Sequence, residues 1–150
     1  MRKISFVIPC YGSEKTIESV VDEIRSTIRS REGFGYEIIL VCDASPDNVY
    51  QVIEQLARED KGIKGINLAK NFGQHSALMT GFNHATGEIV VVLDDDGQTP
   101  ADEMFLLIDK IDDGSDLVFA KYYVKKHHFF RNLGSKLNGL MARYLVGKPK

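Results

Sequence analysis

Three consecutive carboxylates directly follow a short apolar run. The run Ile89–Leu93 is rich in β-branched residues, and Asp94, Asp95 and Asp96 come next, ahead of a glycine and a proline. This pattern predicts a buried strand that ends at the carboxylates. Ligands bind at that edge of an open α/β sheet, and adjacent carboxylates repel one another, so a bound cation is the simplest physical reason to gather them there. The first hypothesis is therefore a site for a divalent metal ion and a phosphorylated ligand.

Three earlier turns also contain residue types suited to a nucleotide. Tyr11 can stack on a base or a ribose, and Asp43 can accept a hydrogen bond from a base N–H. Lys70 comes shortly before a glycine and an expected helix start, a combination that suits phosphate, although the same spacing fits a surface lysine. Ser45 or Asp47 is expected to cap the helix that follows it.

Short apolar segments alternate with segments of helical periodicity, which predicts an α/β fold with a mostly parallel sheet and helices on both faces. The expected strands are Ile4–Pro9, Glu37–Cys42, Ile63–Leu68, Ile89–Leu93 and Leu117–Ala120. The expected helices follow the first four strands, within residues 17–28, 49–56 and 77–85 and, beginning just after Pro100, through residue 111. With right-handed crossovers throughout, the turns after the first, second and fourth strands lie at the same edge of the sheet.

The length and composition indicate one domain over residues 1–150. The chain is 43% hydrophobic, which is enough for a core. No apolar run approaches the roughly 20 residues of a membrane span, and Ile4–Cys10 is too short for the core of a signal peptide, so we expect a cytoplasmic chain. Cys10 and Cys42 are expected to be free thiols, because two cysteines make neither a disulfide framework nor a zinc quartet.

Charge is distributed unevenly along the chain. Eight Lys and Arg follow Asp116 but no Asp or Glu does, and the first 116 residues, with 11 Lys and Arg against 21 Asp and Glu, carry a formal charge of −10. The basic segment also carries an apolar stripe at helical spacing: Leu133, Leu137, Leu140, Met141, Tyr144 and Leu145. This segment suits a diphosphate, a lipid phosphate or a membrane surface, or it forms a solvated helix face. Nucleic-acid binding is not expected, because the turns at the ligand edge are acidic.

Four segments together form a recognisable series. They are Ile8–Glu14, Cys42–Asn48, Asn71–Leu78 and Asp94–Pro100. In this order they resemble the Pro-x-Tyr-Asn-Glu, Asp-Asp-Gly-Ser, Arg-Asn-Phe-Gly and Asp-x-Asp-x-Gln-x-Pro segments of the family 2 glycosyltransferases, which have the Rossmann-like GT-A fold. The resemblance is greatest to the branch that includes dolichyl-phosphate mannosyltransferase and the bacterial undecaprenyl-phosphate sugar transferases. Each segment alone is a weak signal, but four in register are a strong one.

The resemblance implies a metal-dependent, inverting transferase that moves a sugar from a nucleotide diphosphate donor to an acceptor such as a polyprenyl phosphate. It favours UDP as the nucleotide, with GDP as the alternative, and it implies peripheral contact with the cytoplasmic membrane. The residues that it implies are Pro9, Tyr11, Glu14 and Asp43 around the nucleoside, Lys70 near the diphosphate, Asp94 and Asp95 toward the ribose and phosphates, and Asp96 on Mg²⁺ or Mn²⁺.

The chain departs from the family pattern at four positions within or next to these four segments. Gly12 replaces an asparagine, Cys42 an aspartate, Ala44 a glycine and Lys70 an arginine. Cys42 cannot supply a carboxylate, Ala44 disfavours a left-handed turn, and Lys70 keeps the charge of arginine but loses its bidentate fork. In this family the acidic residue that acts as base lies beyond the point that corresponds to residue 150, so no catalytic base is expected in this chain.

Two other function classes remain open from the residues. One is a nucleotide-binding module that binds the donor without turnover. The other is a Mg²⁺-dependent phosphoacceptor domain, because such domains also gather aspartates at strand ends. In that class a carboxylate is expected after the first strand, and here the first strand ends in Pro9, Cys10 and Tyr11.

Overall fold

The computed structural model describes residues 1–98 and 103–120. The chain divides into two compact units, Met1–Val118 and Phe119–Lys150, and the first contains every described helix and strand. In chain order these are β1 (Arg2–Cys10), α1 (Ile17–Arg29), β2 (Phe34–Cys42), α2 (Val49–Glu59), β3 (Ile63–Asn67), α3 (Gln74–His84), β4 (Ile89–Val92) and α4 (Met104–Asp112). The predicted α/β class is confirmed.

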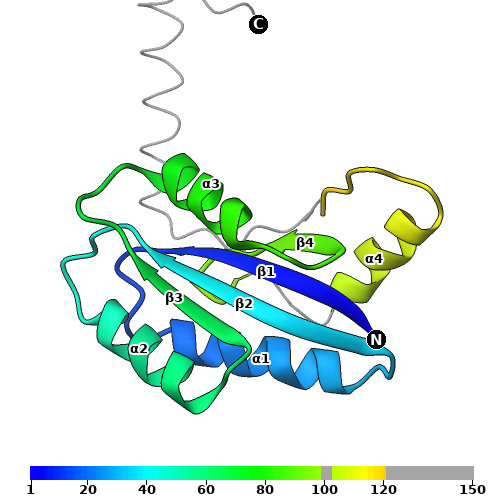
Figure 1. The fold of residues 1–150 in the computed structure, drawn as a ribbon, viewed down its shortest axis with the longest axis horizontal. Coiled ribbons are helices and arrows are strands. Elements are labelled where there is room, and N and C mark those ends of the chain that lie inside the picture. Colours follow the sequence, from blue (N-terminus) through cyan, green and yellow to red (C-terminus); the bar gives the residue numbers. More distant parts are fainter. Residues whose placement is uncertain (99–102, 121–150) are drawn as a thin grey trace, which may run out of the picture. The chain divides into compact units, whose positions relative to one another are not determined.

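The four strands form one parallel sheet in the order β3-β2-β1-β4. The pairing is continuous, because β1 is in register with β2 from Arg2 to Cys10 and with β4 from Ile4 to Val7. The chain first builds the sheet in one direction, from β1 to β3, and then crosses back to place β4 on the other side of β1 (Figure 1). The carboxyl ends of β1 and β4 therefore meet where the strand order reverses, which is the usual ligand position in open α/β sheets.

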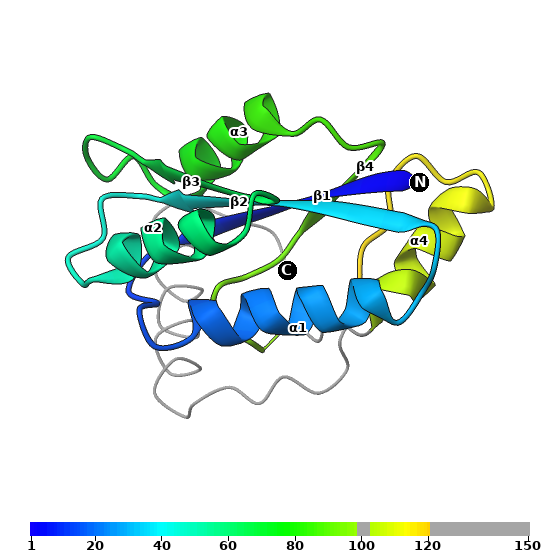
Figure 2. The same cartoon turned by 60° about the horizontal axis from the view of Figure 1, so that its bottom comes forward.

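Helices cover both faces of this sheet. Figure 2 shows α1 and α2 on one side and α3 on the other, as right-handed crossovers in opposite directions require. The larger core lies on the α1 and α2 side, where Ile4, Phe6 and Ile8 of β1 pack among buried residues of α1, α2 and α4. Alternation along β1 turns Val7 to the α3 side, where it packs with Ala77.

Close contact between α3 and the sheet depends on a glycine. Gly81 is buried on α3, and a Cβ atom at this position would lie 2.3 Å from Cγ1 of Val7. No side chain fits in that space, so Gly81 sets how closely α3 approaches β1. This contact helps fix α3, whose first turn lies at the ligand edge.

Two predictions about strands are wrong. Residues 117–120, expected as a fifth strand, pair with no strand in the described part of the chain, and Leu117 and Phe119 are 70% and 81% exposed. The strand before the carboxylates, expected to be buried, is the edge strand β4 of the described sheet, with Val90 and Val92 44% and 45% exposed. A short β-branched run has the same appearance in a central strand and in an edge strand, so composition does not separate the two.

Two further expectations involve residues outside the described ranges. The apolar stripe over 133–145 lies wholly outside them, as does Pro100, while α4 begins at Met104. None of the helices within the described residues combines the length and the apolar character needed to cross a membrane.

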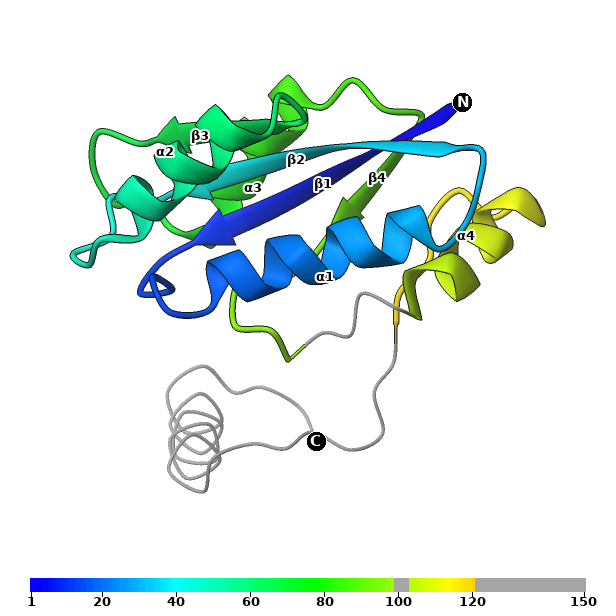
Figure 3. The same ribbon diagram turned by 90° about the horizontal axis from the view of Figure 1, so that it is seen from below.

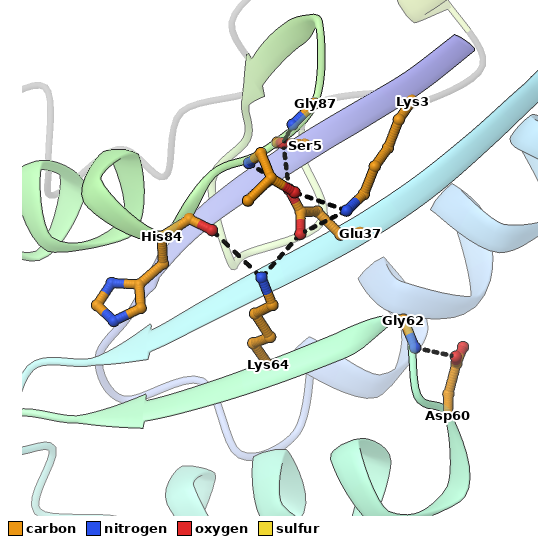
Figure 4. Close-up of polar contacts among 9 residues, drawn as sticks. Lys3, Ser5, Glu37, Asp60, Gly62, Lys64, His84 and Gly87 are labelled. Atoms are coloured by element: carbon orange, nitrogen blue, oxygen red, sulfur yellow. Dashed lines mark hydrogen bonds and ion pairs between the residues drawn. The ribbon is translucent and has the colours of Figure 1, made fainter. Parts of the chain in front are cut away.

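A buried carboxylate joins several elements on the α3 side of the sheet (Figure 4). The side chain of Glu37, in β2, is 3% exposed and accepts hydrogen bonds from Lys3 and Lys64 at 3.0 and 2.9 Å. It also accepts from the hydroxyl of Ser5 and from the backbone and hydroxyl of Thr86, just after α3. Burial alone would raise the pKa of Glu37, but these hydrogen bonds outweigh it and hold the pKa far below its usual range.

Candidate functional site

Four loops meet at the carboxyl edge of the sheet. Because all strands are parallel, the segments after β1, β2, β3 and β4 leave the same edge, and Figure 3 shows the arrowheads of these strands directed toward it. Each loop contains one of the four segments identified from the sequence. The predicted common edge is therefore confirmed, and the β3 loop lies there too.

Asp95 ties the β4 loop to the β1 loop. Its Oδ2 accepts a hydrogen bond from the N–H of Tyr11 at 2.9 Å, and its backbone oxygen accepts one from the hydroxyl of Thr16 at 2.7 Å. These two bonds span the place where the strand order reverses. Tyr11 is 54% exposed, so the loop is held through its backbone while much of the residue remains accessible to solvent.

The β1 and β2 loops are joined by a second set of hydrogen bonds. The N–H of Glu14 donates to Oδ2 of Asp47, and Oε2 of Glu14 accepts from the N–H of Asn48, both at 2.9 Å. The hydroxyl of Ser45 accepts from the N–H of Gly12 at 2.8 Å and donates to Oδ1 of Asp47 at 2.6 Å. Reciprocal bonds of this kind fix the two loops relative to each other.

Asp47 also contacts the start of α2. Its Oδ1 accepts a hydrogen bond from the N–H of Val49, the first residue of that helix, at 3.3 Å. The N-cap residue of α2 is Asn48, one position later than the expected cap, and its side chain makes no capping bond. Burial alone would raise the pKa of Asp47, but bonds from the hydroxyl of Ser45 and the N–H groups of Glu14 and Val49 outweigh it and lower the pKa. Asp47 is therefore a stable anion within the loop network.

Asp43 joins the β2 loop to the β3 loop. The residue is 4% exposed, and its two carboxylate oxygens accept hydrogen bonds from the N–H groups of Phe72 and Gly73, each at 2.7 Å. The ammonium group of Lys70 lies over the ring of Phe72, 5.0 Å from its centroid. Lys70 and the start of α3 are thus close together, as the phosphate hypothesis requires.

Ala44 adopts a left-handed backbone conformation, although an alanine at this position was expected to disfavour one. Its φ is 49°, whereas every other described residue with a positive φ is a glycine. An alanine pays a steric cost in this region that a glycine does not. Local strain therefore lies directly beside Asp43.

The remaining predicted residues line the same edge. Pro9 is half-buried near the end of β1, while Asp94 and Asp96 are exposed in the β4 loop. Oδ1 of Asp96 accepts a hydrogen bond from the N–H of Gln98 at 3.0 Å. Within residues 1–98 and 103–120, no three His, Cys, Asp or Glu side chains are grouped so as to enclose a metal ion. An exposed pair of carboxylates instead suits an ion whose other ligands are phosphate oxygens and water.

The carboxylates of Asp43, Asp47 and Asp95 make this edge negatively charged. Cys10 and Cys42, which are buried free thiols in register on β1 and β2, as expected, lie close to these charges. Burial is the main cause that raises the pKa of Cys10, and the nearby charge of Asp95 raises it further. Among the described residues, the ion pairs of the molecule involve none of Asp43, Asp47 and Asp95. A cation at this edge would therefore be stabilised.

Sequence reasoning missed the part that Thr16 plays in holding the β4 loop. It also did not identify the backbone N–H groups that Asp43 and Asp95 bind. Thr16 and Asp95 are 79 residues apart, so no local pattern connects them. The only available signal was a threonine just before an amphipathic helix, which more often indicates a helix cap.

Solved structures of similar fold are known. PcManGT, a mannosyltransferase from Pyrobaculum calidifontis in complex with GDP-Man and Mn²⁺, is 28% identical over 70% of this chain and 31% of its own, with a TM-score of 0.59. TarS 1–349 of S. aureus in complex with UDP-GlcNAc is 20% identical over 85% of this chain and 39% of its own, also with a TM-score of 0.59. The second likeness shows the fold alone.

The chain spans only 31% and 39% of the lengths of these two solved chains. Its fold is GT-A-like, with a parallel sheet between layers of helices. The model of the family described as Glycosyl transferase family 2 matches residues 5–146, which is nearly the whole sequence. This chain therefore belongs to glycosyl transferase family 2.

Proposed function

We propose that the carboxyl edge of the sheet binds the nucleotide diphosphate part of a nucleotide-sugar donor, and that the whole protein transfers the sugar to an acceptor. The observation that carries this proposal is the set of cross-loop hydrogen bonds at the β1 and β4 carboxyl ends, centred on Asp95 and Tyr11. They organise an acidic, solvent-facing edge in a member of a transferase family. Organisation before binding lowers the entropic cost of holding a ligand.

Each predicted residue has a role in this proposal. Pro9, Tyr11 and Glu14 line the nucleoside side, where the exposed ring of Tyr11 offers a stacking surface. Lys70 and the first turn of α3 face the diphosphate, because a cation and helix N–H groups both favour phosphate. Asp94 and Asp95 lie on the ribose and phosphate side, with the carboxylate of Asp95 already bound to the backbone of Tyr11.

Asp96 is the proposed holder of Mg²⁺ or Mn²⁺. Its side chain is an exposed carboxylate, which is a suitable ligand for these hard ions. The metal ion, when bound, would neutralise the diphosphate and make it a better leaving group. PcManGT, which contains Mn²⁺ and GDP-Man, supports this assignment and favours a GDP-sugar, whereas the resemblance noted from the sequence favours UDP.

The proposed acceptor is a lipid phosphate at the cytoplasmic membrane surface. The support for it is the basic, apolar-striped sequence beyond Asp116, which suits an anionic surface. The second pKa of a phosphate monoester is about 6, so the attacking oxygen would already be ionised at pH 7. Transfer would then depend mainly on positioning, and the need for a base would be small.

A binding module without turnover is the second candidate. The observation that favours it is the short span of the chain, which covers 31% and 39% of the two similar transferase chains. Both candidates predict donor binding by this chain, and only the first predicts sugar transfer by the whole protein. A transfer assay of the whole protein with lipid-phosphate acceptors therefore separates them.

The proposal is tested by calorimetric titration of GDP and UDP into the purified chain, with Mn²⁺ and with EDTA. We expect metal-dependent binding of one nucleotide, and a loss of at least about tenfold in affinity for Asp96→Ala, equivalent to one lost charged contact. Asp109→Ala on α4 is the matched control, since its exposed carboxylate pairs with Arg31 away from this edge. Equal binding with EDTA and with Mn²⁺ would contradict the metal assignment, and no binding to either nucleotide would contradict the proposal.

A further inference from the structure

Asp43 is too enclosed to serve as a direct ligand contact. It is 4% exposed, and both carboxylate oxygens accept backbone hydrogen bonds, from Phe72 and Gly73. At 2.7 Å each, these bonds are short and involve a charged acceptor, which places them among the stronger kind of hydrogen bond. A base or ribose could reach this carboxylate only by displacing the β3 loop.

The backbone of Asp43 is fixed from the other side. Its N–H donates to the carbonyl of Cys10 at 3.1 Å, and the carbonyl of the preceding Cys42 accepts from the N–H of Leu68 at 2.9 Å. Asp43 therefore joins the rigid ends of β1 and β2 to the loop after β3. The side chain of Asp43 therefore fixes the position of that loop relative to the sheet.

The loop that Asp43 holds contains the proposed diphosphate contacts. Gly73 is the N-cap residue of α3, with a φ of 88°, and Phe72 lies beneath the ammonium group of Lys70. The first N–H groups of a helix have no acceptor within the helix, so those of Gln74 and His75 are available to an anion. Displacing Phe72 and Gly73 would move both the lysine and the helix start.

We propose that Asp43 is a positioning residue for the diphosphate of the donor, acting through residues 70–75 and without touching the nucleoside. The inference rests on the proposed function, because it assigns the diphosphate to this loop. It also changes the role that the family resemblance implied for Asp43, which was a place around the nucleoside.

The test compares Asp43→Asn with the wild-type chain in two measurements. Asparagine keeps the shape of the side chain but replaces one acceptor oxygen with a donor, so one N–H of the loop loses its bond to residue 43. We expect faster amide hydrogen exchange at Phe72 above all, because the N–H of Gly73 also has Oδ1 of Asn71 as an acceptor at 3.2 Å. We also expect a rise of about tenfold or more in the Kd for the nucleoside diphosphate with Mn²⁺. The Kd for the free nucleoside should be unchanged.

A double-mutant cycle with Lys70→Ala separates positioning from a general loss of structure. Because Asp43 positions Lys70 as well as the helix start, the losses from Asp43→Asn and Lys70→Ala should add to less than their sum in the double variant, whereas independent roles would give additive losses. Asp60→Asn is the control, because Asp60 also accepts a loop N–H, from Gly62, as well as bonds from Arg25 and Tyr36, but it precedes β3, at the opposite end of that strand from residues 70–75. If the asparagine variant fails to fold, Asp43→Glu is the second variant, because its carboxylate is displaced by one methylene group. It should likewise raise the Kd for the nucleoside diphosphate and leave the Kd for the free nucleoside unchanged.

Three outcomes would overturn the inference. Equal weakening of nucleoside and diphosphate binding would return Asp43 to the nucleoside, and unchanged exchange at Phe72 and Gly73 would show that it does not hold the loop. If the wild-type chain binds neither GDP nor UDP, the proposed function fails together with this inference. The first two outcomes require no failure of the proposed function, so the two failures can be distinguished.

Discussion

Strand β2 carries a buried carboxylate near its start and another just past its end, and the two are held in opposite ways. Glu37 is paired with Lys3 and Lys64 and receives further bonds from Ser5 and Thr86. Among residues 1–98 and 103–120, the hydrogen-bond donors to the carboxylate of Asp43 are backbone N–H groups alone. The charge near the amino end of the sheet is thus neutralised within the protein, whereas negative charge at the carboxyl edge is left to attract a cation.

This difference separates a structural role from a ligand-binding one. The negative potential of Glu37 is largely cancelled by the two lysines, so it would attract a ligand only weakly. The bonds from Thr86 to Glu37 connect the segment between α3 and β4 to β2. Carboxylates bound only by backbone dipoles keep most of their negative potential. The same residue type therefore stabilises the fold at one end and prepares a site at the other.

The largest expected effect is that of Glu37→Gln. The variant removes the charge that two lysines and three other donors bind, so we expect a loss of about 2–3 kcal/mol in the free energy of unfolding, with the half-exposed lysines keeping the cost at the lower end. Urea denaturation measures it. Glu88→Gln is the control, because Glu88 forms only a long, exposed ion pair with Arg2 and should cost well under about 1 kcal/mol. If Glu37→Gln lost as little stability as Glu88→Gln, the structural role assigned to Glu37, in contrast to Asp43, would be contradicted.

The pH dependence of stability sharpens the same comparison. The pKa of Glu37 is lower in the folded chain than in the unfolded chain, where it is about 4.3, so its contribution is present above that value and is lost as pH falls through the folded pKa. We expect the stability difference between the wild-type chain and Glu37→Gln to shrink progressively below about pH 4. Unfolding curves at pH 7, 4 and 3 check this, and a constant difference would contradict it.

Ala44→Gly probes the strain beside Asp43 and should have the smallest effect. Glycine relieves the cost of a φ of 49° but adds entropy to the unfolded chain, so we expect a gain of about 0.5–1 kcal/mol in the free energy of unfolding. Ala57→Gly, within helix α2, should instead lose about 1 kcal/mol. Thermal unfolding of both variants gives the comparison, and a loss for Ala44→Gly would show that this turn is unstrained.

Much of this fold follows from local patterns in the sequence. Four strands and four helices have the apolar spacing of their class, and the parallel arrangement places their loops at one edge. The strand expected at Leu117–Ala120 was wrong because a four-residue apolar segment becomes a strand only if another strand is available to pair with it. Local composition carries no information about that partner.

The site could be predicted only in part, for a related reason. Residue types at strand ends indicated which loops bind a ligand, but the partners of Asp43 and Asp95 are backbone N–H groups distant in the sequence. Lys3, Glu37 and Lys64 were not singled out either, although charged residues inside apolar strands are a usable signal of a buried pair. Their pairing depends on strand order, which spacing does not determine.

The most direct test of the central claim measures stability and nucleotide affinity together in Glu37→Gln and Asp96→Ala. If the ligand binds at the carboxyl edge, Glu37→Gln should lose stability but bind the nucleoside diphosphate and Mn²⁺ with unchanged affinity while it remains folded. Asp96→Ala should keep its stability and lose metal-dependent affinity. The reverse pattern, with affinity lost at Glu37 and retained at Asp96, would contradict the assignment of the ligand to the carboxyl edge.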